Sequence, residues 1–518
     1  MLFLTLLCEA KVKLPVILSN GMVLQREQNI QVWGNADPGE QVTVHFLKKK
    51  YTTQAGEDGN WKVTLPPTKA GGPYTMAING VELKNILIGD VYLCSGQSNM
   101  ELPINRVTDM FRDEIATYSN PMIRHIKVPL NYNFHKSQED IKPTEWKELN
   151  PVDGMQFSAL AYFFAKEMYE KNKIPVGLIN SAVGGSPIEA WISEEGLKPF
   201  PKYLSDRDLY RLDEYVEAIR KTDRMKQNRW SEVLYKNDPG LHEPTKWFDA
   251  AYDDTDWQTF DLFDTGWSNN GINPNNGSHW FRKEIEISEK QVSGQATLRL
   301  GCIVDADSVY VNGTFVGTIA YQYPPRIYKL PEGLLKVGKN TVTVRLISYG
   351  GRPRFVPDKP YKIVFNNNEL SLEGIWKYKQ GAPMPASTGG TTFQYIPTGL
   401  YNAMIAPLRN LSFKGAIWCQ GESNTGRYNE YYDLLTSMIA DWRTKLASQV
   451  PFVIVELAEY GKPDGWDLFR QVQRRVANDT PNAALAPAKD LGEWNDIHPL
   501  NKKAVGIRVA NEMNRLIN

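Results

Sequence analysis

Ser98 lies at the end of an apolar run in the stretch "DVYLCSGQSNMELP", residues 90–103. The run has a strand-like composition, stops at small polar residues and becomes apolar again at Met100. A plain turn gives such a pattern, and so does a nucleophile held at the carboxyl end of a sheet strand. A serine hydroxyl attacks when a histidine takes its proton, a third group orients that histidine, and donors face the developing oxyanion.

Residues of these types occur at three other places in the chain. Asp496 and His498 lie in a loop before a C-terminal helical segment, Gly185 lies in a turn of small residues, and Gln420 ends another apolar run. Taken one at a time, a histidine before a proline and a glycine-rich turn are structural more often than catalytic. Together they are candidates for the base, its orienting acid and the oxyanion donors.

The segments around these residues alternate between strand-like and helix-like patterns. A helix with one apolar face is predicted over residues 157–173, and a strand that ends in small residues lies within 174–193. Residues 413–446 repeat the order of strand, polar turn and amphipathic helix, and residues 450–460 contain another buried strand. This alternation predicts a doubly wound parallel α/β sheet, whose ligands bind at the carboxyl ends of the strands. The three polar turns are therefore expected in one crevice.

Two further regions have β patterns. Residues 12–89 carry short alternating runs separated by Gly, Pro, Asn or Asp, which predicts a small antiparallel β-sandwich. Residues 235–383 also alternate and contain Asn-Gly turns, which predicts an inserted all-β domain. The α/β domain is therefore expected in two parts, 90–234 and 384–518. The charged segment 206–236 is predicted to be an entry linker or a long surface helix.

Composition and motifs exclude several other classes of protein. Lys+Arg and Asp+Glu both number 59, so the formal net charge is zero, whereas nucleic-acid and anionic-membrane partners favour a basic excess. The six histidines form no HExxH motif and no i, i+4 pair. Residues 333–340 approach a phosphate-binding loop, but Asn340 replaces the Ser or Thr that would hold magnesium. We expect no metal and no cofactor.

The first residues indicate export. Residues 1–11 contain a short apolar run, which is far shorter than the about 20 residues that span a bilayer. The run is typical of a trimmed signal-peptide core without its basic start, and an N-terminal strand is the alternative. We expect a secreted or periplasmic protein with no membrane insertion.

Four cysteines in 518 residues do not make a disulfide scaffold. The principal interpretation is that they are small buried residues. Cys94 and Cys419 both precede polar motifs in apolar runs, so neighbouring strands and a disulfide between them are the alternative.

Four motifs taken together resemble one family. "SGQSNM", "GGSPIEAW", "WCQGESN" and "DIHP" stand in this order along the chain. They are similar in type and order to motifs of the SGNH hydrolase superfamily, specifically its sialate O-acetylesterase-like branch of carbohydrate esterases. The resemblance covers residues 90–220 and 384–518 and implies a flavodoxin-like doubly wound sheet.

The resemblance also implies roles for individual residues. Ser98 is the implied nucleophile and His498 the implied general base. The implied oxyanion hole consists of Gly185, Gln420 and the backbone N–H of Ser98. Glu422 is implied to be a supporting residue that fixes the turn carrying Gln420, and not a second base.

Two departures from the superfamily pattern leave alternatives open. The commoner spacing is Asp-x-x-His, whereas Asp496 stands two residues before His498, so Asn495 or a backbone carbonyl is an alternative orienting group. The usual Gly-x-Asn-Asp block is replaced by a segment from Gln420 to Asn424, so Asn424 is the alternative to Gln420.

The inserted region has a resemblance of its own. Its stretches "HWFRKEIEI", "ATLRLGCIVDADSVYVNGTFVG" and "GLLKVGKNTVTVRL" are similar to the galactose-binding-like jelly roll of family 2 glycoside hydrolases. Such modules buttress a catalytic site or bind sugar, and buttressing is the preferred interpretation here. Trp191 and Arg427 are predicted to line the sugar site, since an arginine suits a sialate carboxylate.

The sequence therefore predicts a serine esterase that removes O-acetyl groups from carbohydrate through an acetyl-serine intermediate. The predicted substrate is O-acetylated sialic acid, and acetylated xylan or another polysaccharide is the alternative. A carbohydrate-binding protein with a vestigial esterase site is the alternative from another class. The sequence makes no prediction of oligomeric state.

Overall fold

The computed structural model describes residues 12–264, 275–291, 294–350, 353–366, 368–446, 449–461 and 465–517. The chain divides into two compact units, Met1–Tyr215 with Thr392–Asn518, and Val216–Thr391. The predicted leader, residues 1–11, lies outside the described residues.

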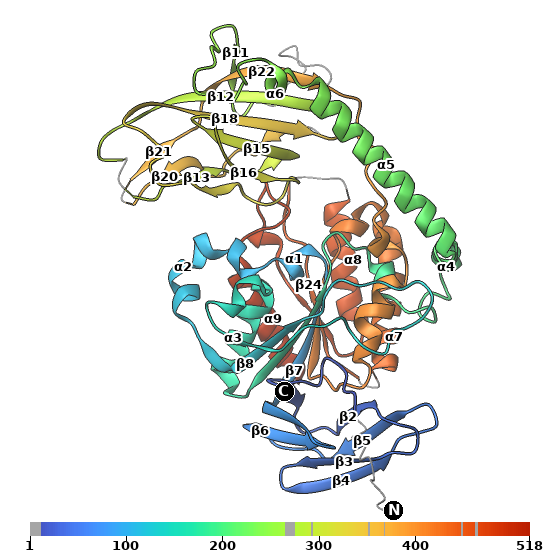
Figure 1. Cartoon of the computed structure of the whole chain (residues 1–518). Helices are drawn as coiled ribbons and strands as arrows, with labels where there is room; N and C mark the ends of the chain where they lie inside the picture. Colours follow the sequence, from blue (N-terminus) through green and yellow to red (C-terminus); the bar gives the residue numbers. More distant parts are fainter. Residues whose placement is uncertain are drawn as a thin grey trace, which may run out of the picture. The chain divides into compact units, whose positions relative to one another are not determined.

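Strand β7 (Val81–Gly96) belongs to two parts of the first unit. Its first half pairs antiparallel with β6 and parallel with β1, and its second half pairs parallel with β10 and β23. The predicted division between residues 89 and 90 therefore falls inside one continuous strand. Figure 1 shows β2–β6 at the opposite end of β7 from helix α1 (Ser98–Glu101).

The N-terminal β part contains six strands before β7. β3 pairs antiparallel with β4 and β6, while β2 and β5 form a separate antiparallel pair. The strands are β1 (Val23–Gln25), β2 (Ile30–Asn35), β3 (Gln41–Phe46), β4 (Lys49–Gln54), β5 (Asn60–Leu65) and β6 (Gly71–Ile78).

The central sheet of the first unit has the order β25-β24-β23-β7-β10-β8-β9. All neighbouring pairs are parallel except β8 with β9. The predicted parallel sheet is thus confirmed. Its further strands are β8 (Asn120–Lys127), β9 (Lys147–Leu149), β10 (Val176–Ala182), β23 (Gly415–Cys419), β24 (Phe452–Val455) and β25 (Ala483–Ala486).

Helices cover both faces of this sheet (Figure 1). Val91 and Leu93 of β7 join the core formed with α7 and α8, whereas Tyr92 and Cys94 join the core formed with α3 and α9. Alternate residues of one strand thus enter two cores, which is why the strands are apolar throughout. The helices are α2 (Thr108–Thr117), α3 (Ala159–Asn172), α4 (Pro201–Leu209), α7 (Tyr428–Lys445), α8 (Trp466–Asp479) and α9 (Lys502–Ile517).

Short helical turns complete the first unit. Most are 3₁₀ turns, and η5 is a π-helical turn. They are η1 (Ile104–Arg106), η2 (Asp153–Gln156), η3 (Ile188–Trp191), η4 (Phe393–Tyr395), η5 (Tyr401–Ile405), η6 (Ala406–Leu408), η7 (Glu422–Arg427) and η8 (Lys489–Leu491).

Helix α5 (Asp213–Asn237) connects the two units along the chain, so most of the charged segment is helical. The second unit is otherwise antiparallel β, with a six-stranded sheet, β11-β22-β12-β18-β15-β16, and a four-stranded sheet, β17-β13-β20-β21. β14 and β19 form a further pair. One hydrophobic core contains residues from both larger sheets, including Phe281, Leu298 and Val344.

The bounds of the second unit's elements follow. They are α6 (Pro239–His242), β11 (Gln258–Asp261), β12 (Gly277–Ile287), β13 (Thr297–Leu300), β14 (Ile303–Val304), β15 (Ala306–Val311), β16 (Thr314–Ile319), β17 (Ile327–Lys329), β18 (Gly338–Ser348), β19 (Arg354–Phe355), β20 (Tyr361–Val364), β21 (Glu369–Ser371) and β22 (Ile375–Pro383).

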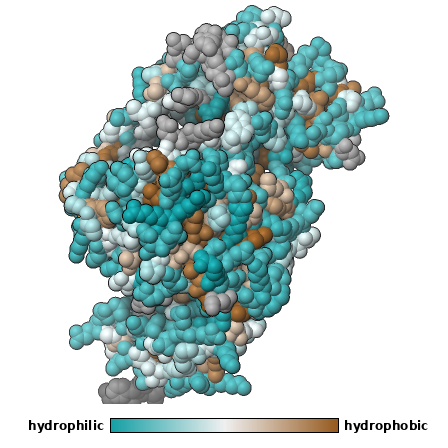
Figure 2. All heavy atoms as spheres, turned by 180° about the vertical axis from the view of Figure 1, so that it is seen from behind, coloured by the Kyte–Doolittle hydropathy of each residue, from teal (hydrophilic) through white to brown (hydrophobic). Residues whose placement is uncertain are grey.

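The surface in Figure 2 is mostly hydrophilic, with hydrophobic residues scattered among polar ones. Scattered apolar side chains are usual on the surface of a folded protein. Within the described ranges, no helix is both long enough and apolar enough to cross a bilayer.

Candidate active site

Ser98 stands where three neighbouring parallel strands end together. In the register of the sheet, Gly96 of β7 lies opposite Ala182 of β10 and Cys419 of β23. A Cβ at Gly96 would lie 2.0 Å from the carbonyl oxygen of Cys419, so only glycine fits there. The chain then turns into α1, whose first residue is Ser98. The strand order reverses between β7 and β23, where ligands of open α/β sheets bind.

The turn after β10 lies beside Ser98. A Cβ at Gly184 would lie 3.7 Å from the Ser98 Cβ. Tyr395 Oη donates to the Gly184 carbonyl at 2.9 Å, Ser423 Oγ donates to the Gly185 carbonyl at 2.7 Å, and the Gly184 N–H donates to Glu101.

Two backbone N–H donors remain available here, one in the turn after β10 and one at the start of α1. Among the described residues, the N–H groups of Gly185 and Ser98 have no hydrogen-bond acceptor. The carbonyls of the turn are held by Tyr395 and Ser423, which fixes its orientation. This arrangement is suited to stabilising an oxyanion near Ser98.

Asn99 connects the serine turn to the histidine loop. Its Nδ2 donates to the backbone carbonyl of Ile497 at 3.0 Å and to Glu422 Oε1 at 2.5 Å. Ile497 directly precedes His498, so the side chain next to Ser98 contacts the backbone next to the predicted base. Asn99 Oδ1 accepts a hydrogen bond of 2.6 Å from Lys502 Nζ.

Asp496 faces His498, as an orienting acid must. Its Oδ1 accepts a hydrogen bond from the His498 backbone N–H at 2.9 Å and lies 3.7 Å from the ring Nδ1. Both side chains are 8% exposed. The carboxylate therefore caps the histidine's own backbone and also lies within ion-pair range of its ring.

The predicted oxyanion role of Gln420 conflicts with its contacts. Its Nε2 donates to the Ser186 carbonyl at 3.2 Å and to Asn424 Oδ1 at 2.7 Å, and its Oε1 accepts from Tyr431 at 2.7 Å. Both amide hydrogens are used, because an NH₂ group has only two. Gln420 therefore braces neighbouring segments and has no hydrogen left to donate.

Asn424, the alternative to Gln420, is also buried. Its Nδ2 donates to Glu189 Oε2 at 3.1 Å, and its Oδ1 accepts from the backbone N–H of Ile188. Glu422 contacts Asn99 and is not among the residues that hold the Gln420 side chain. The turn is instead braced by Gln97, whose Oε1 accepts from the N–H groups of Gly421 and Ser423.

The prediction that Trp191 lines a sugar site is wrong. Its side chain is fully buried, packs edge-on against Trp418 and donates from Nε1 to Ser186 Oγ. It therefore has no surface to offer a sugar. Arg427 is partly exposed, and its guanidinium binds Glu189 at 2.7 Å and the Tyr203 hydroxyl at 2.5 Å.

The disulfide alternative is not realised. Cys94 and Cys419 lie on neighbouring strands, but both are free and buried. In the register of β23 with β7, Cys94 is opposite Ile417. Burial raises the pKa of the Cys419 thiol to about 12, so this thiol stays protonated at neutral pH.

The sequence interpretation missed Asn99 and Lys502. Lys502 begins α9 and is 2% exposed, although it is charged. One signal was present, because Lys502 continues the stripe of Val505, Val509 and Met513 at helical spacing, which is the buried face of α9. A lysine on a buried stripe is rare unless it is paired.

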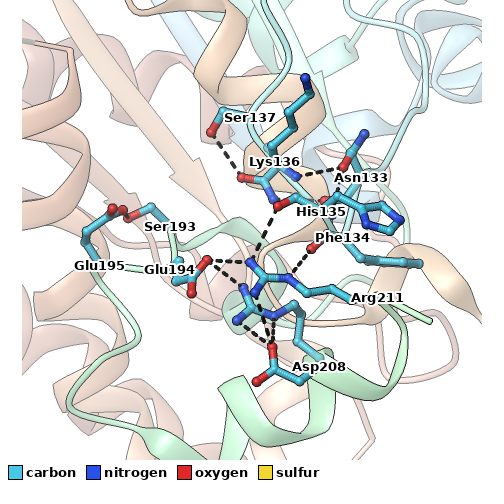
Figure 3. A network of polar contacts seen from close by, with 12 residues as sticks. Asn133, Phe134, His135, Lys136, Ser137, Ser193, Glu194, Glu195, Asp208 and Arg211 are labelled. Atoms are coloured by element: carbon cyan, nitrogen blue, oxygen red, sulfur yellow. Dashed lines mark hydrogen bonds and ion pairs between the residues drawn. The ribbon is translucent and has the colours of Figure 1, made fainter. Parts of the chain in front are cut away.

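A second polar region of the first unit lies around a cavity of about 380 Å³. Arg211 donates to Glu194 at 2.6 Å and to the Phe134 carbonyl at 3.0 Å (Figure 3). Arg207 lies 3.1 Å from the same carboxylate. Opposite charges around the cavity pair with one another, as Arg409 does with Glu139. None of the predicted catalytic residues lines this cavity. Within the described ranges, no group of three or more His, Cys, Asp or Glu side chains is arranged to hold a metal ion.

Comparison with protein families identifies the chain. Residues 88–236 and 380–515, more than half of the chain, match the model of a carbohydrate esterase family, the sialic acid-specific acetylesterases. The chain belongs to this family. Its sialate O-acetylesterase-like motifs lie within the matched residues.

Relatives of this chain include mammalian proteins. The chain is 33% identical over 204 residues to the sialate O-acetylesterase of Homo sapiens, and 32% identical over 203 residues to that of Pongo abelii. Each match covers 35% of this chain and 39% of the relative, so it spans less than half of these curated proteins.

A solved structure resembles this chain over almost its entire length. It is a carbohydrate acetylesterase from Xanthomonas citri, with a TM-score of 0.58 and 23% identity. The likeness covers 98% of this chain and 75% of the other. At this identity the likeness concerns the fold.

Proposed function

We propose that this chain is a serine esterase of the SGNH type that removes O-acetyl groups from carbohydrate. The observation that carries the proposal is the position of Ser98, beside the Gly184–Gly185 turn and tied through Asn99 to the loop of His498. Membership of the carbohydrate esterase family supports the reaction class.

The proposed reaction has two halves. Ser98 Oγ attacks the acetyl carbonyl while its proton passes to His498, and the N–H groups of Ser98 and Gly185 stabilise the oxyanion. Collapse of the tetrahedral intermediate breaks the ester bond, and His498 returns the proton to the sugar oxygen. Water then attacks the acetyl-serine by the same route and releases acetate. Asp496 orients His498 throughout.

O-acetylated sialic acid is the proposed substrate. The matched family and the curated relatives, both described by activity on sialic acid, support this choice. The guanidinium of Arg427 is already shared by Glu189 and Tyr203, so it supports sialate less directly than the sequence suggested. Acetylated xylan or another polysaccharide is the alternative that the experiment must separate.

The fold type and role of the second unit, and the location of the protein, are also proposals. We infer that the second unit is an inserted galactose-binding-like jelly roll with a structural role, and that the protein is exported. The antiparallel sheets of the second unit support the first inference. The predicted boundaries at 234/235 and 383/384 also remain proposals.

The test is acetate release by the wild type and by Ser98→Ala on O-acetylated sialic acid and on acetylated xylan. Losing the nucleophile is expected to lower kcat by about 10⁶-fold. The preferred substrate then decides the sugar class. Equal activity in both proteins would show that Ser98 is only a turn residue. Intact glycan binding without acetate release from wild type would favour a carbohydrate-binding protein.

A further inference from the structure

The cavity of about 380 Å³ in the first unit is enclosed by segments that are distant in sequence. Its volume falls within the range of about 300–1,000 Å³ that is usual for small-molecule sites. The lining segments are the loop after β8, the turn after η3, the helical turns η5 and η6 with the residue that follows, and the end of α7. Several parts of the first unit therefore meet around one hollow, as they do around a bound ligand.

Tyr401 supplies this cavity with a hydroxyl that the protein itself does not use. The residue lines the cavity and is 4% exposed. Its hydroxyl makes no hydrogen bond with any residue that the structure describes. Burial raises the pKa of this hydroxyl, the charges of Asp441 and Glu195 raise it further, and Arg409 lowers it. Because Glu195 and Arg409 line the same cavity, the hydroxyl lies on the cavity side of the ring.

Asn402 supplies a second buried polar group. It lines the cavity and is 7% exposed. Its Nδ2 donates to the Asn133 carbonyl at 2.9 Å, and its Oδ1 accepts from Ser137 Oγ at 3.2 Å. An amide nitrogen has two hydrogens, so one remains for a further acceptor. Buried polar groups in folded proteins almost always have partners, so Tyr401 and Asn402 are suited to receive theirs from a ligand.

The charges that line the cavity favour a neutral ligand. Each of the three lining carboxylates already has a cationic partner, so a charged ligand must compete with an ion pair. Lys136 is exposed at the cavity, where solvent weakens its charge. The pairs are Glu139 with Arg409, Glu194 with Arg211, and Glu195 with Lys445.

The same groups place donors and acceptors side by side. Lys445 Nζ lies 3.1 Å from Glu195 Oε2, and an ammonium group has three hydrogens to donate. A carboxylate accepts several hydrogen bonds, and a phenol both donates and accepts. A sugar hydroxyl also both donates and accepts. Neighbouring hydroxyls of one sugar ring therefore match a lysine beside a carboxylate, and an amide beside a phenol.

We propose that this cavity is a second binding site, separate from the candidate active site, and that it takes one neutral sugar residue of a carbohydrate. Tyr401 and Asn402 bind hydroxyls of the sugar directly. The Lys445–Glu195 pair binds neighbouring hydroxyls, one group as donor and the other as acceptor. The proposal does not rest on the esterase reaction, because none of the candidate catalytic residues lines the cavity.

Binding of free monosaccharides to the full-length protein tests this proposal. Galactose, glucose and mannose are the neutral probes, and saturation-transfer NMR measures their dissociation constants. We expect at least one of them to bind wild type and Ser98→Ala equally well. Tyr401→Phe removes only the hydroxyl and should weaken this binding by about 10-fold, the effect of one hydrogen bond. No binding of any probe to wild type would overturn the proposal, whether or not the protein releases acetate.

Further variants separate binding from folding. Because the Tyr401 hydroxyl has no protein partner, Tyr401→Phe should leave the free energy of unfolding in urea unchanged. Tyr432→Phe is the matched control, since its hydroxyl donates to Asp479 on the surface, and it should leave sugar binding unchanged. Ser137→Trp puts a large side chain at an exposed lining position and should abolish binding. Wild-type sugar binding by folded Ser137→Trp or folded Tyr401→Phe would overturn the proposal.

Charged analogues test whether the ligand is neutral. The uronic acid and the 2-amino sugar that match the best-binding hexose keep its ring and add one negative or one positive charge. We expect both to bind more weakly, because each must compete with an ion pair of the cavity. Tighter binding of either analogue would overturn the assignment to a neutral ligand. Equally tight binding of glycerol, which has hydroxyls and no ring, would overturn the assignment to a sugar.

Discussion

The side chain of Asn99 donates a hydrogen bond of 3.0 Å to the backbone carbonyl of Ile497. These residues are the immediate neighbours of Ser98 and His498, which are 400 positions apart in sequence. Alignment of the proposed nucleophile and the proposed base therefore depends on a contact that neither of them makes. Its formation requires the complete first unit to fold, because β7 and α9 come from opposite ends of the chain.

Gly185 should tolerate no side chain. Its φ is +72°, and a Cβ there would lie 1.8 Å from the Tyr395 hydroxyl. We expect Gly185→Ala to displace the backbone N–H that is proposed to bind the oxyanion and to lower kcat by about 10²- to 10³-fold, the usual effect of losing one oxyanion donor.

Gly184→Ala is the matched comparison for this change. The nearest atom to its Cβ is Glu101 Oε2 at 3.3 Å, at the end of a flexible side chain. Acetate-release kinetics of the two variants should show a much smaller loss for Gly184→Ala. Equal losses would indicate that crowding near Ser98, and not the Gly185 N–H, causes the effect.

Gln420 should matter for stability more than for catalysis. Gln420→Ala removes one buried hydrogen bond from the Tyr431 hydroxyl and one from Asn424 Oδ1, although each atom keeps another partner. We expect a loss of about 1–3 kcal/mol in the free energy of unfolding, measured with urea. Gln54→Ala removes an exposed amide and should change little. A folded Gln420→Ala with unchanged stability and a 100-fold lower kcat would restore the oxyanion role.

His125 should make the protein less stable in mild acid. Burial lowers the pKa of this histidine to about 4, whereas an unfolded histidine titrates near 6.5. Between these values the unfolded chain binds more protons than the folded chain, so stability falls as the pH falls from about 6.5 to about 4. His125→Leu should remove up to about 3 kcal/mol of this loss.

Urea unfolding of wild type and His125→Leu at several pH values between 4 and 8 measures this effect. The two stability curves should run parallel above pH 7 and converge or cross toward pH 4. Parallel curves over the whole range would exclude His125 as a source of acid sensitivity.

Asp307 and Arg326 form a buried ion pair in the second unit. The side chains are 0% exposed, and Arg326 Nε lies 2.6 Å from Asp307 Oδ1. Asp307→Asn leaves the arginine charge buried without its counterion, so we expect this unit to lose about 3–5 kcal/mol of stability in urea unfolding. Glu284→Gln breaks the exposed pair with Lys339 and should have no measurable effect. Equal midpoints for Asp307→Asn and wild type would contradict the prediction.

The sequence predicted the elements better than the contacts of single side chains. Strands such as β7 and β23 were visible as apolar runs ending in small residues. The helix α3 was predicted with one apolar face, but its residues from Ala159 to Ala165 are all buried. These features are local, because each depends on the periodicity of a short segment. That the turns after these strands lie at one edge of the sheet could also be predicted, because ligands of parallel sheets bind at the carboxyl ends of the strands.

The contacts of Gln420 and Trp191 could not be predicted from local sequence patterns. An amide at a strand end has the right chemistry for an oxyanion, and only the positions of Ser186, Asn424 and Tyr431 show that it is already occupied. Trp191 is buried by Trp418, which is more than 200 residues away in sequence. The burial of Lys502 is explained by its hydrogen bond to Asn99, which is distant in sequence.

Because β7 runs unbroken from the N-terminal strands to the turn that carries Ser98, the two regions should melt as one cooperative unit. A chain that begins at residue 90 would lose the N-terminal strands and, with them, the Gln25 Oε1 that accepts from the Val91 N–H and the Arg26 guanidinium that pairs with buried Asp90. Amide hydrogen exchange along the interior of β7 should therefore report one common opening energy on both sides of the cut point. The N-terminal strands thus serve as an anchor for the strand that leads to the proposed nucleophile.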